Sequence, residues 1–237
     1  MKPIRQAVRW LGNSYIRRVL ALDYKRQQAD SRGPNERPLE YSFALNALSF
    51  SQYQDVLDVG AGISAWPAIL RNCGYHVTAI DKVSGYWSEE LVNHHIHIIR
   101  DDIVSPKIDK EFGIITCLST LEHIPSHLRA VTSMANLMRP GGILVLSFPY
   151  NEHRYVENVY DLPEAGYGKD QDYICQVFSR DVINKWLSTT ALRLVQQRYY
   201  RFFTGELWTL GHRLWPGQEV DSTEPHHLTG IVLQKIP

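Results

Sequence analysis

The chain has 237 residues, of which 44% are hydrophobic and 21% charged, a composition typical of a soluble globular protein. Its 25 basic and 25 acidic residues give a formal net charge of zero, which argues against a dedicated nucleic-acid-binding protein. Three cysteines without metal-type spacing indicate thiols in a reducing compartment, and no apolar stretch is long enough for a membrane span.

The first 26 residues combine basic charge with a helical spacing of apolar side chains. They hold seven basic residues and one acid, so this segment carries a net charge of +6. Residues 1–37 are therefore predicted to form a basic helix and a loop outside the main domain. Three roles stay open for the helix: it could lie on an anionic membrane, cap a cleft or pack against a second subunit. Its apolar stripe lacks bulk, so capping or a homodimer contact is favoured. No signal peptide is visible, and we expect a cytoplasmic protein.

Strands and helices alternate from residue 38 onward. Helices are predicted from Pro38 to about residue 49, from Ser64 to Gly74, at residues 89–93, and from about residue 128 to a stop at Pro140-Gly141-Gly142. The predicted strands between them are residues 53–59, 75–80, 96–99, 112–118 and 143–148. Alternation of this kind predicts a doubly wound α/β fold, with a mostly parallel sheet and helices on both faces.

The pattern changes after Pro149. A helix is predicted after Ser179, and strands at residues 192–202 and 228–235 are predicted to close the sheet. Two long connections, residues 149–176 and 203–227, separate these elements. Long connections in compact domains are often binding loops, so both are predicted to form the substrate pocket of a domain over residues 38–237.

A nucleotide-cofactor motif occupies the first predicted strand and its turn. Residues 55–62 read DVLDVGAG, and a second strand, TAID, ends about twenty residues later at Asp81. Gly60 and Gly62 let the chain turn tightly and let a ligand approach the backbone, while Asp81 can accept hydrogen bonds from a ribose diol. Gly60-x-Gly62-x-x-Ala65 also satisfies the dinucleotide fingerprint, so a nicotinamide enzyme is one interpretation.

Four features favour S-adenosylmethionine over a dinucleotide. Asp58, two residues before Gly60, would repel a pyrophosphate but attract a cationic amino-acid tail. Asp101 and Asp102 follow the third strand, where an acid can accept from an adenine amine. No basic residue stands near the glycines in the sequence, and two strands joined by a long connection end the chain.

Together these segments resemble the class I S-adenosylmethionine-dependent methyltransferases well over residues 38–138. The resemblance extends through residue 149 and weakens beyond it. The resemblance rests on VLDVGAG, on TAID, on RDD at residues 100–102 and on CLSTLEHI at residues 117–124. One departure is Ser64, which stands where the family has its third glycine. The resemblance implies a seven-stranded Rossmann-like sheet with an antiparallel last strand. It also implies these cofactor-binding residues: Asp58, Gly60, Ala61, Gly62, Asp81, Lys82, Asp101, Asp102, Ile103 and Leu118.

Two histidines are candidates for the general base of an O-methyltransferase. His123 follows the fourth strand, near where the methyl group should point, but ordering the loop or contacting the cofactor without moving a proton is the favoured alternative. His153 lies in the loop after the fifth strand, at the same sheet edge, and could equally be a surface residue. The predicted methyl acceptor is the hydroxyl group of a small molecule: a sugar, a glycan precursor or a secondary metabolite.

Metal and nucleic-acid roles are not predicted. His94, His95 and His97 crowd together, as do His226 and His227, but no cysteine or acid partner is evident for a metal site. Two rival functions remain: an NAD(P)-dependent oxidoreductase and a non-catalytic binder that keeps the cofactor fold.

Overall fold

The computed structural model describes residues 35–82, 93, 96–166, 168–169 and 171–236, together with Ser14 and Arg18. The chain divides into two compact units, residues 1–36 and 37–237. The predicted N-terminal helix with its homodimer contact, apart from Ser14 and Arg18, and the helix predicted at residues 89–93, apart from Asn93, lie outside the described residues and stay predictions. His94 and His95 also lie outside the described residues. Among the helices that the structure describes, none combines the length and the hydrophobicity needed to cross a membrane.

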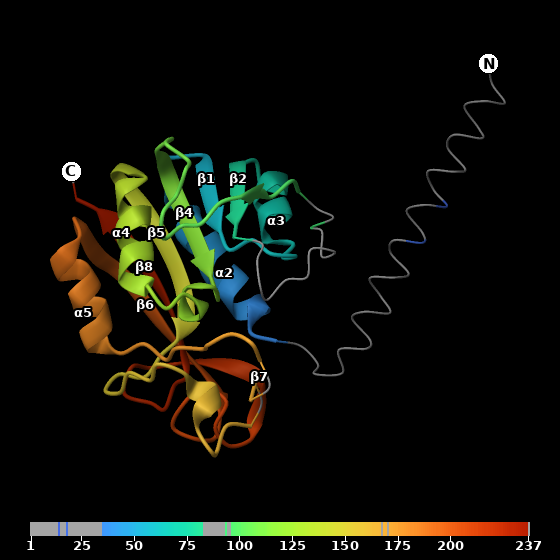
Figure 1. The fold of residues 1–237 in the computed structure, drawn as a ribbon, viewed down its shortest axis with the longest axis vertical. Helices are drawn as coiled ribbons and strands as arrows, with labels where there is room; N and C mark the ends of the chain where they lie inside the picture. Colours follow the sequence, from blue (N-terminus) through green and yellow to red (C-terminus); the bar gives the residue numbers. More distant parts are fainter. Residues whose placement is uncertain are drawn as a thin grey trace. The chain divides into compact units, whose positions relative to one another are not determined.

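The second unit is built on one sheet with helices on both faces (Figure 1). Its helices are α2 (Arg37–Leu48), α3 (Trp66–Asn72), α4 (His127–Asn136) and α5 (Arg180–Thr189), with short 3-10 helices η1 (Leu121–His123) and η2 (Val159–Asp161). Its strands are β1 (Asp55–Val59), β2 (His76–Asp81), β3 (Ile99–Arg100), β4 (Phe112–Leu118), β5 (Met138–Pro149), β6 (Leu192–Phe203), β7 (Arg213–Val220) and β8 (Leu228–Lys235).

The strand order is β3-β2-β1-β4-β5-β8-β6-β7. The strands β1 to β5 are parallel, and β8 inserts antiparallel between β5 and β6. This confirms the mostly parallel, doubly wound sheet with an antiparallel last strand. The sheet has an eighth strand where seven were expected. The extra strand is β7, which pairs antiparallel with β6 at the edge and lies within the predicted loop 203–227.

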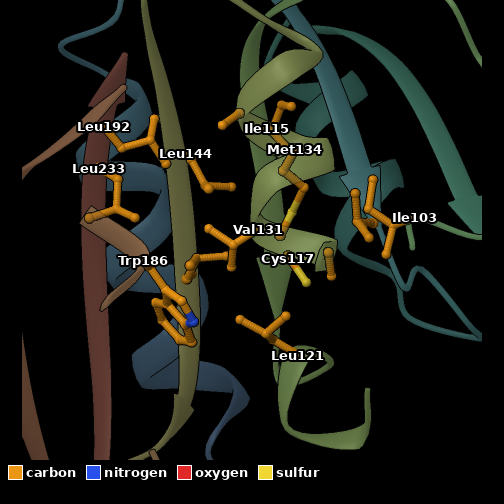
Figure 2. Close-up of a cluster of buried hydrophobic side chains, with 14 of the residues drawn as sticks. Ile103, Ile115, Cys117, Leu121, Val131, Met134, Leu144, Trp186, Leu192 and Leu233 are labelled. Atoms are coloured by element: carbon orange, nitrogen blue, oxygen red, sulfur yellow. The ribbon is translucent and has the colours of Figure 1, made fainter. Parts of the chain in front are cut away.

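Buried side chains fill the space on both faces of the sheet. One core joins α4 and α5 to the sheet, and Figure 2 shows Val131 and Met134 of α4 close to Ile115 and Cys117 of β4. The other core joins Phe43 and Leu48 of α2 and Trp66 of α3 to the opposite face. Burial on both faces explains why β4 reads as a nearly continuous apolar run, in which all seven residues are buried.

Several predicted boundaries are wrong. Helix α4 ends at Asn136, before Pro140-Gly141-Gly142, because these residues belong to β5 and form an irregular stretch of its pairing with β4. The third strand is only Ile99–Arg100, not residues 96–99. Helix α3 begins after Ala65, and the Ser64 hydroxyl instead accepts the Trp66 N–H at 3.0 Å, just before the regular turns begin.

Candidate functional site

The glycine turn follows β1 at the carboxyl end of the parallel strands, where ligands bind in sheets of this kind. Gly60 and Gly62 have φ values of +77° and +46°, a region that residues with a Cβ adopt only at a cost. The N–H groups of Gly60 and Ala61 both donate to the carbonyl of Ile80 in β2. A Cβ on Gly60 would lie 2.1 Å from Thr120 Cγ2, so this position requires glycine for space as well as for backbone angle.

Replacing Gly60 with alanine should therefore destabilise the fold by more than its backbone angle alone explains. Left-handed alanine costs about 1–2 kcal/mol, and overpacking adds about 1–3 kcal/mol. Rotation of Thr120 gives no relief, because its Cβ would also lie only 2.7 Å away. Gly141→Ala is the matched control, since Gly141 has φ +74° but open space around it. Urea unfolding of both variants measures the difference, and equal losses would contradict the argument.

Asp58 is the penultimate residue of β1, two residues before Gly60, and only 3% of it is exposed. Its Oδ1 accepts a hydrogen bond from Thr116 Oγ1 at 2.7 Å. Burial raises the pKa of Asp58 to about 7, although the Thr116 hydroxyl and the Arg37 charge both lower it. A buried carboxylate of this kind gains strongly from a cationic partner that replaces lost water.

Asp81 ends β2 and is also buried. Its Oδ2 accepts the Gly62 N–H at 2.9 Å, so the acid of the second strand holds the glycine turn. The Asn93 amide donates to the carbonyls of Gly62 and Ser64 at 3.0 and 2.9 Å, on the other side of the same turn. The spacing motif predicted Asp81 here, whereas nothing in the sequence pattern indicated Asn93.

The two acids after β3 take different places. The carboxylate oxygens of Asp101 accept the backbone N–H groups of Asp102, Lys107 and Ile108 at 2.9–3.1 Å, so Asp101 orders the turn. Asp102 keeps 34% of its side chain exposed and pairs with Lys82 at 3.0 Å. Burial acts to raise the pKa of Asp102, but the hydrogen bond from the Val104 N–H and the contact with Lys82 outweigh it, so the pKa is lowered. Ile103 beside it is buried in the core. Of the two predicted acids, Asp102 is the one that presents a carboxylate at the surface.

A buried acid from α2 joins the site, although the sequence analysis did not single it out. Glu40 is fully buried, and its Oε1 accepts hydrogen bonds from the hydroxyls of Ser119 and Ser147. Its Oε2 pairs with Arg37 at 3.0 Å. These contacts tie α2 to the carboxyl ends of β4 and β5.

Arg37 brings a positive charge to the side of the site formed by α2 and β4. Its Nη1 also donates to the carbonyl of Leu118, the last residue of β4 and a predicted cofactor residue, at 3.3 Å. Its positive charge lowers the pKa values of both Asp58 and His123. No basic residue stands near the glycines in the sequence, but the fold brings this one in from the helix before β1.

His123 ends η1, just beyond β4. Its Nδ1 lies 2.7 Å from the carbonyl of Ile174, and because a carbonyl only accepts, Nδ1 carries the proton. The neutral ring therefore has its lone pair on Nε2, which lies 3.8 Å from Glu122 Oε1. Burial lowers the pKa of His123 below its usual range, so the ring is neutral at pH 7. A neutral imidazole with a fixed tautomer is suited to act as a base.

The predicted substrate loop is fastened onto η1. Gln176, which is 1% exposed, donates through its amide to the carbonyls of Glu122 and Ile124 at 3.2 and 2.9 Å. Its backbone N–H also donates to Glu122, and the Tyr155 hydroxyl donates to its Oε1 at 2.8 Å. Together with the bond between His123 and Ile174, these contacts place the loop directly beside His123.

The second predicted base, His153, lies in the exposed part of the same loop, where its backbone N–H donates to Asn151 Oδ1 at 3.0 Å. The neighbouring Tyr150 is fully buried, and its hydroxyl donates to Glu152 at 2.6 Å. Glu152 in turn pairs with Arg180 at 3.0 Å. His123 is therefore held by contacts with Ile174 and Glu122, whereas His153 lies exposed at the surface.

The paired histidines near the chain end have structural contacts. His227 Nδ1 accepts the backbone N–H groups of Phe202 and Phe203, and its Nε2 donates to Gly205 at 2.7 Å. His226 Nδ1 donates to Glu224 at 2.7 Å. Over the part of the chain that the structure describes, no cluster of three or more histidine, cysteine or acidic side chains could hold a metal ion.

Residues 16–197 match the family described as a methyltransferase domain. Among curated proteins, the ubiquinone biosynthesis O-methyltransferase of Xylella fastidiosa is 31% identical over 132 residues, which cover 50% of this chain and 52% of that protein. The protein of the same name from Xanthomonas campestris is 34% identical over 118 residues, 46% of this chain and 47% of its own. The chain thus spans about half the length of the curated relatives it matches.

Solved structures share the fold at low sequence identity. An S-adenosylmethionine-dependent methyltransferase from Clostridium acetobutylicum matches with a TM-score of 0.58 at 11% identity, over 92% of this chain and 99% of the other. The 1,6-didemethyltoxoflavin-N1-methyltransferase of Burkholderia thailandensis matches with a TM-score of 0.53 at 16% identity, over 94% and 89% of the two chains. These likenesses establish the Rossmann-like architecture of the sheet.

Proposed function

Because the chain belongs to the methyltransferase domain family, we propose that it transfers a methyl group from S-adenosylmethionine to a hydroxyl group of a small molecule. The observation that carries this proposal is the buried carboxylate of Asp58 directly before the glycine turn. A pyrophosphate would be repelled there, whereas an ammonium group would be attracted. The charge of Arg37 acts on the same carboxylate, and a zwitterionic amino-acid tail needs both charges.

The other predicted residues fit the remaining parts of that cofactor. We assign Asp81 to the ribose hydroxyls, and Asp102 with Ile103 and Lys82 to the adenine end. The backbone of Gly60, Ala61 and Gly62, with Leu118 at the end of β4, would line the space between them. Asp101 supports this surface by ordering the turn after β3. Gly60 fits this role because the turn has no room for a Cβ.

When bound, S-adenosylmethionine supplies an electrophilic methyl group on a sulfonium, and alignment of the reactants can contribute roughly 7–11 kcal/mol to such a reaction. This chain's residues would hold the acceptor and move its proton. His123 Nε2 is the candidate base for the acceptor hydroxyl, because Nδ1 is held by Ile174 and the ring is neutral at pH 7. The loop fastened by Gln176 and the segment 203–227 would form the acceptor pocket. His153 is the second candidate for the base.

The cysteines support a reducing location. All three, Cys73, Cys117 and Cys175, are free thiols. We therefore propose a cytoplasmic protein, and a disulfide detected in the purified native protein would contradict this.

Isothermal titration with S-adenosylhomocysteine, S-adenosylmethionine and NAD(P) tests the cofactor. We expect micromolar binding of the first two and none of the nicotinamide nucleotides. Tight NAD(P) binding without S-adenosylhomocysteine binding would overturn the proposal in favour of an oxidoreductase.

An acceptor panel tests the reaction. Phenols, catechols, sugars and amines are incubated with labelled S-adenosylmethionine, and we expect labelled methyl groups on hydroxyl acceptors. Label on amines alone would contradict the hydroxyl assignment. Binding without turnover across the whole panel would support the non-catalytic alternative.

A further inference from the structure

A chain of three buried side chains leads to the carboxylate of Asp58. The Trp66 indole Nε1–H donates to Thr116 Oγ1 at 3.2 Å, and Thr116 Oγ1 donates to Asp58 Oδ1 at 2.7 Å. The exposed fractions of Trp66, Thr116 and Asp58 are 2%, 0% and 3%. This series of hydrogen bonds therefore lies in the interior of the domain.

The fold explains why these residues meet. Asp58 of β1 and Thr116 of β4 are register partners in adjacent parallel strands, so their side chains share one face of the sheet. Trp66 is the first residue of α3, the helix that follows the glycine turn, and it packs on that face. The Tyr41 ring stacks on Trp66 with centroids 4.9 Å apart, which fixes the indole from the side of α2.

The direction of the hydrogen bonds gives the chain its effect. An indole N–H can only donate, so it occupies a lone pair of Thr116 Oγ1 and leaves the hydroxyl proton directed at Asp58. A donated proton stabilises the ionised carboxylate, and consecutive hydrogen bonds polarise one another. Burial acts in the opposite sense, because it disfavours the charged form.

We propose that Thr116 and Trp66 are positioning residues that keep the Asp58 carboxylate ionised and aimed at the cofactor's ammonium group. This inference rests on the proposed function of Asp58. Other groups act on the same carboxylate: Arg37 of α2 lowers its pKa and Asp81 of β2 raises it. Tyr41 of α2 and Cys117 of β4 also interact with it electrostatically, and both are neutral near pH 7 because burial raises their own pKa values.

Three variants test the chain. Thr116→Val keeps the shape of the side chain but removes the hydroxyl, whereas Thr116→Ser keeps the hydroxyl. Trp66→Phe keeps a ring for Tyr41 to stack on but removes the N–H. Trp186→Phe is the matched control, because Trp186 is equally buried and donates its Nε1–H to His127 Nδ1 at 3.0 Å, on the opposite face of the sheet.

The first measurement needs no ligand. Carboxyl NMR of the labelled protein follows the titration of Asp58, and we expect Thr116→Val to raise its midpoint by about one pH unit, as loss of a hydrogen bond to a charged group implies. Trp66→Phe should shift it less in the same direction, while Thr116→Ser and Trp186→Phe should leave it in place. An unchanged midpoint in Thr116→Val would overturn the proposal, whatever the protein binds.

The second measurement is the affinity for S-adenosylhomocysteine at pH 7.5. We expect about threefold weaker binding in Thr116→Val, because a midpoint raised by about one unit lowers the ionised fraction of Asp58 at this pH by that factor. Thr116→Ser should bind like the wild type, and Trp186→Phe should bind unchanged even where its stability falls. Equal losses of affinity in Trp66→Phe and Trp186→Phe would reduce the role of Trp66 to packing and contradict the proposal. Absence of binding by the wild-type protein would refute the proposed function instead, and the NMR titration would still decide the role of Thr116.

Discussion

Replacing Asp58 with asparagine should weaken binding of S-adenosylhomocysteine by about 10- to 100-fold above pH 7. A hydrogen bond to a charged group contributes about 1.5–3 kcal/mol, and the amide removes the charge while keeping the shape. The pKa of about 7 makes the loss pH-dependent. Wild-type affinity should rise between pH 6 and pH 8 as Asp58 ionises, whereas the affinity of Asp58→Asn should stay flat. Calorimetric titrations at several pH values measure both.

The same substitution should stabilise the protein. Burial raises the pKa of Asp58 from 3.8 to about 7, so the unfolded chain releases this proton at lower pH than the folded one. The contribution of Asp58 to stability is therefore fully present below pH 3.8, falls as pH rises, and is lost above pH 7. The shift corresponds to at most about 4 kcal/mol. The difference in melting temperature between Asp58→Asn and wild type should grow in favour of the variant from pH 5 to pH 8.

Asp55→Asn is the control for these experiments. Asp55 lies at the other end of β1 and pairs with Arg139 at 2.9 Å, away from the glycine turn. Its replacement should leave the affinity unchanged and should not stabilise the fold. If Asp58→Asn bound as tightly as wild type at pH 8, Asp58 would have no part in holding the ligand.

Replacing His123 with asparagine should lower kcat for a hydroxyl acceptor by about 100-fold or more, the usual effect of removing a general base. Asparagine can still donate to the Ile174 carbonyl, so the loop should stay in place while the base is lost. The affinity for S-adenosylhomocysteine should change little. Because burial lowers the pKa of His123, the fall of wild-type kcat at acid pH should be centred below pH 6.5.

Two other histidines serve as comparisons for His123. His127 also has a lowered pKa from burial, but its Nδ1 is held by Trp186, so His127→Asn should leave kcat unchanged and reduce stability. His153→Ala should have little effect on kcat if His123 is the base. The opposite result, a large loss in His153→Ala with an intact rate in His123→Asn, would transfer the role to the exposed loop.

The sequence predicted those parts of the fold whose signal is local. Strands β4 and β8 match their predicted limits because strands that are largely buried on both faces read as short segments rich in apolar residues. The positions of Asp58, Gly60 and Asp81 followed from their order along β1 and β2, because successive parallel strands end at the same edge. Pro140-Gly141-Gly142 was wrongly predicted to lie outside the strand, as the stop of a helix. Its residues fit a helix end locally, and only the pairing with β4 makes them part of β5.

The residues that the sequence did not indicate are those that meet through long-range contacts. Glu40 and Ser147 are 107 positions apart, and no periodicity relates them. Arg37 and Asn93 reach the glycine turn and its neighbours from segments whose own patterns read as ordinary helix and loop. Strand β7 was missed because none of its residues is buried, so it lacks the alternation of buried and exposed positions that is typical of a strand. Register and packing decide such contacts, and neither is visible in one sequence.

The hydrogen bond between Glu40 of α2 and Ser147 of β5 limits where this domain can be truncated. Ser147 lies inside β5, has no solvent access, and donates a hydrogen bond from its hydroxyl to Glu40 Oε1. An expression fragment that starts at β1 would retain every motif of the glycine turn but would leave this hydroxyl facing an empty groove. A fragment that keeps this contact therefore has to include α2, which begins at Arg37.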